Sequence, residues 1–330
     1  MNKYYIGVEI GGTKQQIAVG LSDGSIIDSR QVKLVYRRGA EDILQWLSEN
    51  IREFLAMEAY AGKVQGIGVG FGGPLETSTG RVLSSLQVPG WKDFELKRWF
   101  EAQFGLPVII VNDTVTGGFA ELYKGAGKDS QNFFYTNIGT GIGGGLYIHR
   151  KYYDGSGFGA SYLGNMLVPD WTSDIPGAYT RTELICSGRN IENRLRQDGY
   201  IPEDSALASC HGGNPGQITC RDLADAVRAG DRFAEEELDR IARTFSLALA
   251  NILASQGVDT IVVGGGVANM GDILFDRIRK FTADMAFIAN KGHYQILQSY
   301  FLDEAVLVGA LLVASGKYIE IAEVKSLFPL

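Results

Sequence analysis

The alternation of hydrophobic and polar positions along the chain predicts short buried strands and amphipathic helices that follow one another. Three apolar runs are typical of buried strands: 64–73, 108–113 and 260–266. Apolar residues return at helical spacing in three other segments: 40–61, 221–256 and 304–315. The longest of these, 221–256, is predicted as one amphipathic helix. Strands that alternate with helices indicate an α/β fold, with largely parallel or mixed sheets covered by helices.

Two segments share one design, which is a strand, a glycine-rich turn and a second strand. The first surrounds the turn GGTK at 11–14, and the second surrounds the turn GTGIGGG at 139–145. Their first glycines, Gly11 and Gly139, are separated by about one domain length of chain. The pattern therefore predicts a duplicated α/β unit, and 330 residues are enough for two domains.

Composition and charge narrow the class of protein. The chain is 45% hydrophobic and 21% charged, as is common for folded proteins. A net charge of −7, with both signs interspersed, provides no basic stripe for a phosphate backbone, so we expect no nucleic-acid partner. Three cysteines without a CxxC pair indicate a reducing compartment, and a strand-like run begins almost at once, at 4–10. We expect a cytoplasmic protein without a signal peptide or membrane span.

Both glycine turns follow directly on a strand. Because glycine has no Cβ, such turns allow backbone N–H groups to converge on a phosphate. One turn alone is weak support, since glycine hairpins are common, but two turns that carry the hydroxyl groups of Thr13 and Thr140 are stronger. Neither turn has the spacing of a P-loop, and neither leads directly into a helix as a Rossmann fingerprint does. Phosphate binding here requires another fold.

Six segments of the chain stand in the order found in the ROK family of sugar kinases. They are EIGGTK, VGFGGP, VND, NIGTGIGGG, VVGGGVAN and DEAVLVGA, and they span nearly the whole chain. The protein thus resembles glucokinase-like members of the superfamily of actin, Hsp70 and hexokinase. The resemblance implies a homodimer and two duplicated actin-like ATPase domains of the ribonuclease H type, with ATP and sugar in an interdomain cleft. The smaller domain is expected at 1–115 plus about 316–330, and the larger one at 116–315.

By this resemblance, Asp113 matches the family's catalytic base, at the end of a predicted strand and the start of a predicted helix. A carboxylate there can accept the proton of a sugar hydroxyl during phosphoryl transfer. The residues alone leave an alternative, in which Asn112 and Asp113 only cap the helix that begins near Thr114. Glu9 stands where most members have aspartate, and it would hold the Mg²⁺ of Mg·ATP directly or through a water molecule.

The resemblance also assigns residues to both substrates. The ATP phosphates would be bound by Gly11, Gly12, Thr13, Lys14, Gly139, Thr140 and Gly141. The adenosine would lie beside Gly264, Gly265 and Gly266, although strand-to-helix turns of this kind occur in many folds. The sugar would be bound by Gly73, Pro74, Asn112, Asp113, Tyr162, Asn165 and Glu183. Trp91 is expected to pack nearby as a structural residue.

One segment departs from the family pattern. The family's GExGH segment corresponds to SYLGN, so Tyr162 replaces the sugar-binding glutamate and Asn165 replaces the histidine that binds sugar and zinc. The positions of the zinc-binding cysteines correspond to Asp174, Pro176 and Arg181. We therefore expect no zinc. A hydrogen bond to a charged group contributes about 1.5–3 kcal/mol, so the missing glutamate predicts a substrate that differs from glucose around the anomeric end.

The sequence thus predicts ATP-dependent phosphorylation of a primary hydroxyl of a sugar, whose identity it leaves open. A sugar-responsive repressor is one alternative, but it would need a helix-turn-helix before the first glycine turn, where only eight residues precede Glu9. A non-catalytic sensor of sugar or nucleotide is the other alternative. The altered segment at 161–165 favours the sensor, whereas the preserved Asp113 and glycine turns favour the kinase.

Overall fold

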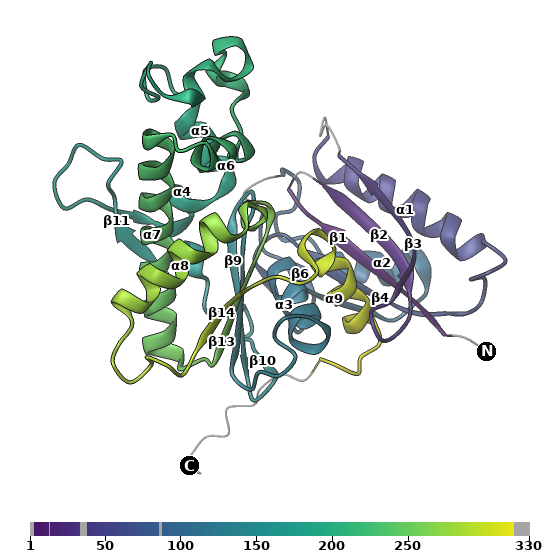
Figure 1. Ribbon diagram of the computed structural model, residues 1–330. Helices are drawn as coiled ribbons and strands as arrows, with labels where there is room; N and C mark the ends of the chain where they lie inside the picture. Colours follow the sequence, from purple (N-terminus) through teal and green to yellow (C-terminus); the bar gives the residue numbers. More distant parts are fainter. Residues whose placement is uncertain (1–2, 13, 34–37, 86–87, 320–330) are drawn as a thin grey trace. The chain divides into compact units, whose positions relative to one another are not determined.

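The computed structural model describes residues 3–12, 14–33, 38–85 and 88–319. In these ranges, strands alternate with helices as the hydrophobic pattern predicts, and two five-stranded sheets form (Figure 1). The α/β class is therefore confirmed. No helix in the described part of the chain combines the length and the apolar character needed to cross a membrane.

The described residues divide into two compact units. The first unit contains the described residues up to Tyr135, Gly145–Ala160 and those from Asp303 onward. The second contains Thr136–Gly144 and Ser161–Leu302. The chain therefore passes from one unit to the other at residues other than 115 and 316. The expected limits of the two domains at those residues stay a prediction.

The sheet of the first unit has the strand order β3-β2-β1-β4-β7. Its strands are β1 (Tyr4–Ile10), β2 (Gln15–Gly20), β3 (Ile26–Val32), β4 (Val64–Phe71) and β7 (Val108–Asn112). β1 pairs antiparallel with β2 and parallel with β4, which pairs parallel with β7. Since parallel strands point the same way, the carboxyl ends of β1, β4 and β7 meet at one edge of the sheet. The short hairpin of β5 (Leu75–Glu76) and β6 (Arg81–Val82) follows β4.

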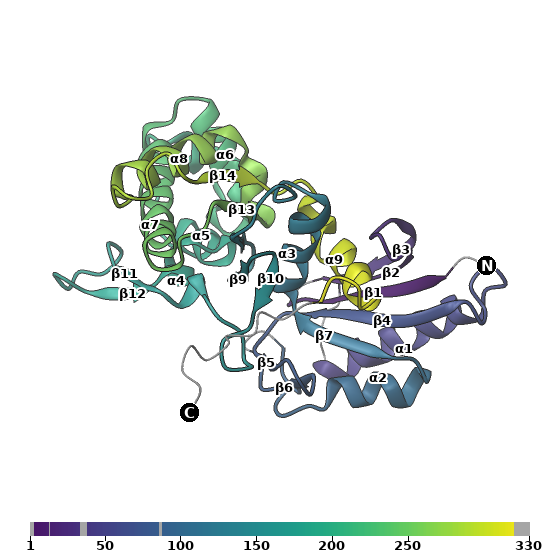
Figure 2. The ribbon, with the colours of Figure 1, turned by 90° about the horizontal axis from the view of Figure 1, so that it is seen from below.

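Helices cover both faces of this sheet (Figure 2). One face carries α1 (Ala40–Ala56) and α2 (Leu96–Phe104), and the other carries α3 (Asp113–Lys124) and α9 (Ala305–Ala314). Side chains of β1 therefore alternate between the two faces. Ile6 and Val8 are buried in the core with α1 and α2, whereas Gly7 faces α9. Glycine also permits α9 to approach β4, since a Cβ on Gly68 would lie 2.0 Å from the carbonyl oxygen of Ala310.

The second sheet has the order β10-β9-β8-β13-β14. Its strands are β8 (Phe133–Ile138), β9 (Ile142–Ile148), β10 (Lys151–Tyr153), β13 (Thr260–Gly264) and β14 (Gln295–Gln298). Counted along the chain, the strands of both sheets lie in the same order: third, second, first, fourth and fifth. The duplicated unit that the two glycine turns predict is therefore present in the topology.

The remaining elements belong mostly to the second unit. Its helices are α4 (Thr182–Cys186), α5 (Gly188–Leu195), α6 (Cys220–Arg228), α7 (Arg232–Gln256) and α8 (Asp272–Met285). The short 3₁₀ turns are η1 (Leu163–Asn165), η2 (Ala206–Gly213), η3 (Pro215–Gln217), η4 (Gly266–Met270) and, leading into α9, η5 (Leu302–Glu304). An isolated antiparallel hairpin is formed by β11 (Leu167–Pro169) and β12 (Tyr179–Arg181).

Two sequence-based predictions of element limits are wrong. The segment 221–256 forms α6 and α7 and not one helix, because Gly230 takes a φ of +79° and Asp231 caps α7 by accepting a hydrogen bond from the N–H of Ala234 at 2.8 Å. The second glycine turn is shorter than predicted. Strand β9 already begins at Ile142, so the glycines that follow it lie in a strand.

Candidate functional site

The first glycine turn joins β1 to β2 in the first unit. The N–H of Gly11 donates to the carbonyl oxygen of Lys14 at 3.2 Å, and a Cβ on Gly11 would lie 2.9 Å from that oxygen. A turn this tight therefore favours glycine. Gly12 lies on the same turn, and the predicted phosphate-binding residue Thr13 lies outside the described residues.

Glu9 lies near the end of β1, and its side chain is 14% exposed. Its Oε2 accepts a hydrogen bond from Nε2 of Gln16 at 2.7 Å and lies 4.0 Å from Nζ of Lys14. Burial raises the pKa of Glu9 to about 7; Lys14 and Gln16 oppose this, and the charges of Asp113 and Asp303 add to it. A cation bound beside Glu9 would therefore stabilise its ionised form and lower its pKa.

The variant Glu9→Gln is expected to flatten the pH dependence of stability in the ligand-free protein. Between the ordinary value of 4.5 and the folded value of about 7, folded Glu9 keeps a proton that the unfolded chain has released. The stability that this proton provides is complete below the unfolded pKa and is lost as the pH rises through the folded pKa, by a total on the order of 3 kcal/mol. Urea unfolding at about pH 5 and about pH 8 measures the loss.

The variant should lose less stability than the wild type between these two pH values. The exposed Glu58→Gln is the matched control and should follow the wild type. Equal losses in Glu9→Gln and wild type would contradict a protonated Glu9 in the folded protein.

Asn112 holds the end of β7 against the turn that follows β4. Its Nδ2 donates to the carbonyl oxygens of Phe71 and Gly73, each at 3.3 Å. Its Oδ1 accepts from the N–H groups of Thr114 at 3.0 Å and Val115 at 3.3 Å. Asn112 is therefore the N-cap of α3, which is the role that the alternative interpretation gave it.

Asp113 is the first helical residue of α3. Its Oδ1 accepts a hydrogen bond from the N–H of Thr114 at 2.7 Å. A Cβ on Gly72 would lie 3.1 Å from Oδ2 of Asp113 and 3.6 Å from Cα of Gly11, so Gly72 leaves space between Asp113 and the first glycine turn. Burial raises the pKa of Asp113, while hydrogen bonds from Thr114 oppose the rise. The side chain is thus a positioned carboxylate with increased affinity for a proton.

Gly73 and Pro74 form the turn between β4 and β5. A Cβ on Gly73 would lie 2.9 Å from the carbonyl oxygen of Ser84, so the turn favours glycine at this position. Trp91 is 1% exposed, and its ring lies edge-on to Phe71 with a centroid distance of 5.2 Å. Its predicted structural role is confirmed.

The carboxylates of the first unit can be compared with the needs of Mg²⁺. In the described ranges, no group of three His, Cys, Asp or Glu side chains converges as a complete metal site. Mg²⁺ is commonly bound by only one or two carboxylates, with waters and substrate phosphates as the other ligands. Glu9 and Asp113 interact electrostatically, and burial raises the pKa of both. These residues therefore fit a Mg²⁺ ion that arrives with a nucleotide.

The second glycine turn lies in the second unit, between β8 and β9. The N–H of Gly139 donates to the carbonyl oxygen of Gly141 at 2.9 Å, and the carbonyl oxygen of Gly139 accepts from the N–H of Gly188 at 2.8 Å. A Cβ on Gly265, whose φ is +84°, would lie 2.6 Å from the carbonyl carbon of Ile138. The predicted phosphate turn with Thr140, the predicted adenosine turn and the start of α5 are therefore neighbours.

The predicted sugar-binding residues of the second unit have different surroundings. Oε2 of Glu183, on α4, accepts a hydrogen bond from the N–H of Ile142 at 2.7 Å, so Glu183 supports the end of the second glycine turn. Tyr162 is half-buried just before η1, and Asn165 is exposed at the end of η1. Glu183 thus has a structural contact besides its predicted sugar contact.

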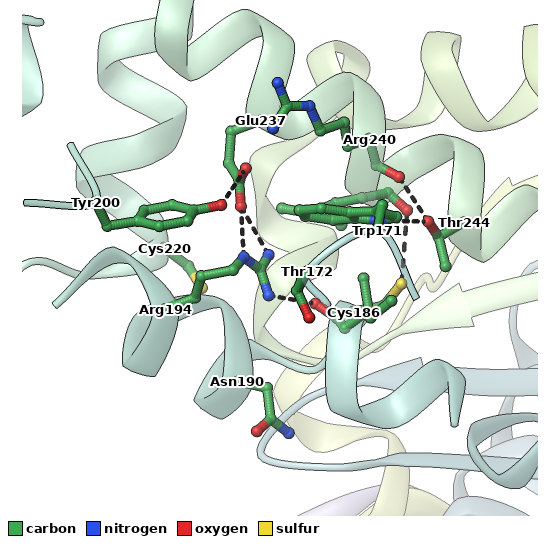
Figure 3. Close-up of polar contacts among 12 residues, drawn as sticks. Trp171, Thr172, Cys186, Asn190, Arg194, Tyr200, Cys220, Glu237, Arg240 and Thr244 are labelled. Atoms are coloured by element: carbon green, nitrogen blue, oxygen red, sulfur yellow. Dashed lines mark hydrogen bonds and ion pairs between the residues drawn. The ribbon is translucent and has the colours of Figure 1, made fainter. Parts of the chain in front are cut away.

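The segment that corresponds to the family's zinc-binding cysteines forms the β11–β12 hairpin and its loop. Nε1 of Trp171, in this loop, donates to Oγ1 of Thr244 on α7 at 2.9 Å. The guanidinium carbons of Arg194 and Arg240 lie 4.8 and 5.7 Å from the centroid of the indole (Figure 3). Trp171 therefore attaches the hairpin to α5 and α7 by side-chain contacts. The expected absence of zinc stays a prediction.

Beneath Trp171, a buried ion pair joins α5 to α7 (Figure 3). Nε of Arg194 donates to Oε1 of Glu237 at 2.8 Å, and the two side chains are 7% and 0% exposed. The hydroxyl of Tyr200 donates to Oε2 of Glu237 at 2.9 Å. Burial first, and then the carboxylate of Glu237, raise the pKa of Tyr200 to about 12, so the phenol stays a donor over the ordinary pH range.

Three residues near these sites were not assigned from the sequence. They are Gly72, Gly188 and Asp303. A signal existed for Gly188, because Ser187 is a helix cap and the glycine after it opens α5. Asp303 belongs to the family motif DEAVLVGA, but only the fold brings its charge near Glu9.

Comparison with known proteins identifies the family of this chain. Residues 5–317 match the ROK family. The chain belongs to this family. The glucokinase of Thermotoga maritima is 29% identical over 307 residues, which are 92% of this chain and 95% of that protein. The xylose repressor of Caldicellulosiruptor bescii is 22% identical over 328 residues, which are 96% of this chain and 79% of that protein.

A solved ROK structure has the same fold. The ROK family glucokinase from Streptomyces griseus, in complex with glucose and AMPPNP, is 27% identical and superposes with a TM-score of 0.79 over 95% of this chain and 99% of that one. The predicted ROK membership and actin-like ATPase fold are thereby confirmed. Since ROK relatives include kinases and a repressor, the activity has to be inferred from the site.

Proposed function

We propose that this ROK protein transfers the γ-phosphoryl group of ATP to a primary hydroxyl of a sugar. Asp113 carries the proposal: Oδ1 is held by Thr114, and Oδ2 faces the space beside Gly72 and Gly11. A residue that served only as a helix cap would not need this open side. The similarity to glucokinases supports the same activity.

In this proposal, Asp113 accepts the proton of the attacking sugar hydroxyl on Oδ2. Its raised pKa makes it a better acceptor than an ordinary aspartate, as a general base requires. Asn112 acts through position, because its hydrogen bonds fix Gly73 and the first turn of α3. Domain closure would exclude water from the reaction.

The ATP phosphates would be bound by residues 11–14 and 139–141, and the adenosine by 264–266 together with Gly188. Glu9 would hold Mg²⁺, directly or through water, and Mg²⁺ neutralises charge on the phosphate oxygens when it is bound. Lys14 provides a positive charge beside the phosphates.

The sugar would be bound by Gly73, Pro74, Asn112, Asp113, Tyr162, Asn165 and Glu183. Tyr162 and Asn165 can donate and accept hydrogen bonds, but neither carries the charge of the glutamate that the family has at position 162. We therefore propose a hexose-like substrate that differs from glucose around its anomeric end.

The proposal includes the setting of the enzyme, a cytoplasmic homodimer without zinc, nucleic acid or membrane among its partners. The net charge of −7 and the absence of a CxxC pair support it. One zinc per chain in metal analysis, or the mass of a single chain in light scattering, would contradict the corresponding part.

The experiment that tests the function is ADP release from Mg·ATP across hexoses, amino sugars, N-acetyl sugars, β-glucosides and polyols. We expect release that depends on both Mg²⁺ and one class of sugar. Product analysis should find the phosphate on the primary hydroxyl. No sugar-dependent ADP release, with ATP binding intact, would reject the kinase.

A second candidate function is a sensor that binds sugar or nucleotide without turnover. The replacement of two family sugar-binding residues by Tyr162 and Asn165 favours it, as does the similarity to a xylose repressor. Calorimetry distinguishes the two functions, because a sensor would bind a sugar of the panel tightly while ADP release stayed at background.

A further inference from the structure

A buried carboxylate outside the assigned site residues has an unsatisfied oxygen. Asp154 follows β10 in the first unit and is only 6% exposed. Its Oδ1 has no hydrogen-bond partner among the residues that the structure describes. Burying an unpaired charge is costly, and most buried polar atoms are hydrogen-bonded. An exception of this kind points to a partner that is not part of the chain.

The pairing of β9 with β10 indicates which face of the sheet Asp154 occupies. The register pairs Tyr153 with Leu146, and its continuation by one residue sets Asp154 opposite Gly145. Directly opposed residues of antiparallel strands share one face. A Cβ on Gly145 would lie 3.3 Å from Cα of Val115, so this face is covered by the first turn of α3.

The next pair of residues on this face of the sheet, Tyr152 and Tyr147, also packs against α3. Tyr152 pairs with Tyr147, whose hydroxyl donates to the carbonyl oxygen of Val115. Both tyrosine rings also contact Phe119, with centroid distances of 6.2 and 5.2 Å. From Phe119 to Val115 the contacts run toward the amino end of α3. Strand β10 ends at Tyr153, and extending its register by one residue directs Asp154 toward the end of α3 that begins with Asp113.

The loop after Asp154 is hydrogen-bonded to the segment that follows β5. The carbonyl oxygen of Asp154 accepts from the N–H groups of Gly157 at 3.2 Å and Gly159 at 3.0 Å, so the loop folds back on its own start. The carbonyl oxygen of Gly157 accepts from the N–H of Thr77 at 3.0 Å. Thr77 follows β5 and the turn of Gly73, so this hydrogen bond joins the loop to the segment after that turn.

The carboxylate of Asp154 is not needed as a cap of α3. The N–H groups of Thr114 and Val115 already donate to Asn112. An ionised carboxylate only accepts hydrogen bonds, and the hydroxyl groups of a sugar are suitable donors. Position 162, where the family has a glutamate for this purpose, is a tyrosine in this chain.

We propose that Asp154 is a substrate-specificity residue that accepts a hydrogen bond from a sugar hydroxyl other than the one phosphorylated, in place of the glutamate missing at position 162. This inference rests on the proposed function for the identity of the ligand as a sugar. It does not rest on turnover, because a bound sugar would make the same contact in a sensor.

The variant Asp154→Asn tests the proposal. For the best sugar of the panel, kcat/KM should fall by about 10–100-fold, mainly through KM. Against a series of monodeoxy sugars, the difference between wild type and variant should vanish for one member, the sugar that lacks the contacted hydroxyl. Asp154→Glu should restore part of the loss. The exposed Asp129→Asn, in the same unit, is the control and should behave as wild type.

Thermal unfolding distinguishes a structural role. Without ligand, Asp154→Asn should unfold at the same temperature as wild type or higher, since it removes an unpaired buried charge. A lower unfolding temperature together with an equal loss for every deoxy sugar would overturn the proposal. Unchanged kcat/KM for all sugars would overturn it as well.

Failure of the proposed function can be recognised separately. If the wild type releases no ADP with any sugar but binds one in calorimetry, the kinase is rejected and the binding constant of Asp154→Asn decides the present proposal. A loss of about tenfold or more in sugar affinity supports it, and equal affinity overturns it. A wild type that binds no sugar overturns both.

Discussion

Replacement of Asp113 by asparagine is expected to lower kcat for sugar phosphorylation by about 10²–10⁴-fold, the usual contribution of a general base. Asparagine has the same shape, and its Oδ1 can still accept the hydrogen bond from the N–H of Thr114. It cannot accept the proton of the sugar hydroxyl. The expected loss is therefore mainly in turnover, with a smaller loss in affinity for sugar and with the unfolding temperature little changed.

Steady-state ADP release and sugar binding by calorimetry measure these quantities side by side. Asp129→Asn, an exposed aspartate after α3, is the matched control and should retain full kcat. If Asp113→Asn kept kcat within about threefold of wild type, Asp113 would be only a structural residue of α3 and another base would be needed. A loss confined to KM would equally contradict the assigned role.

Arg194→Ala is expected to lower the free energy of unfolding by about 3–5 kcal/mol. The reason is Glu237, whose side chain is 0% exposed and would remain buried without its ion-pair partner. The variant also removes the contact of the guanidinium with Trp171, so the β11–β12 hairpin would lose part of its attachment. Chemical denaturation measures the change in stability.

The outer pair of Arg228 and Asp225 offers a matched control. Its side chains are 48% and 61% exposed, so Arg228→Ala should change the stability by only about 0–1 kcal/mol. The double variant Arg194→Met with Glu237→Leu should recover most of the loss, because it removes both buried charges together. A small effect of Arg194→Ala, comparable to that of the control, would show that Glu237 is not left unpaired.

Strands and glycine turns of both sheets could be predicted from the sequence because their signals are local. The strands β1, β4, β7 and β13 are apolar runs with clear ends, and glycines mark the turns after β1 and β8. At Gly11 the closure itself favours glycine, since a Cβ there would lie 2.9 Å from the carbonyl oxygen of Lys14. The common design of two segments was enough to predict a duplication, which the equal strand order of the two sheets confirms.

Other features depend on contacts that periodicity does not contain. Apolar spacing continues from α6 into α7, so only the backbone of Gly230 and the cap at Asp231 reveal the break. Gly145 looks like a turn residue, yet it lies in β9, where a larger residue would meet Val115. In both cases tertiary packing decided between structures that the local sequence allowed.

Some residues of the candidate site could be found from the sequence and others could not. Glu9, Asn112 and Asp113 could be found because they stand at strand ends within recognisable motifs. Gly72 and Asp154 could not, since their significance is spatial: one leaves space beside a carboxylate, and the other is a buried acid with an oxygen that no described residue hydrogen-bonds. No spacing rule distinguishes Asp154 from an ordinary loop aspartate.

The place of α9 in the chain has a consequence for biosynthesis. α9 completes the packing of the first unit: a Cβ on Gly309 would lie 1.8 Å from the carbonyl oxygen of Thr116 on α3. The ribosome makes this helix only after residues 161–302 of the second unit, so the N-terminal sheet emerges first, and one of its faces has α3 but still lacks α9. Proteolysis of nascent chains should accordingly find protection of 161–302 before that of β1 and β4, and the opposite order would show that the sheet closes without its last helix. The strands β1 and β4, although synthesised before residues 161–302, would thus become resistant to aggregation after them.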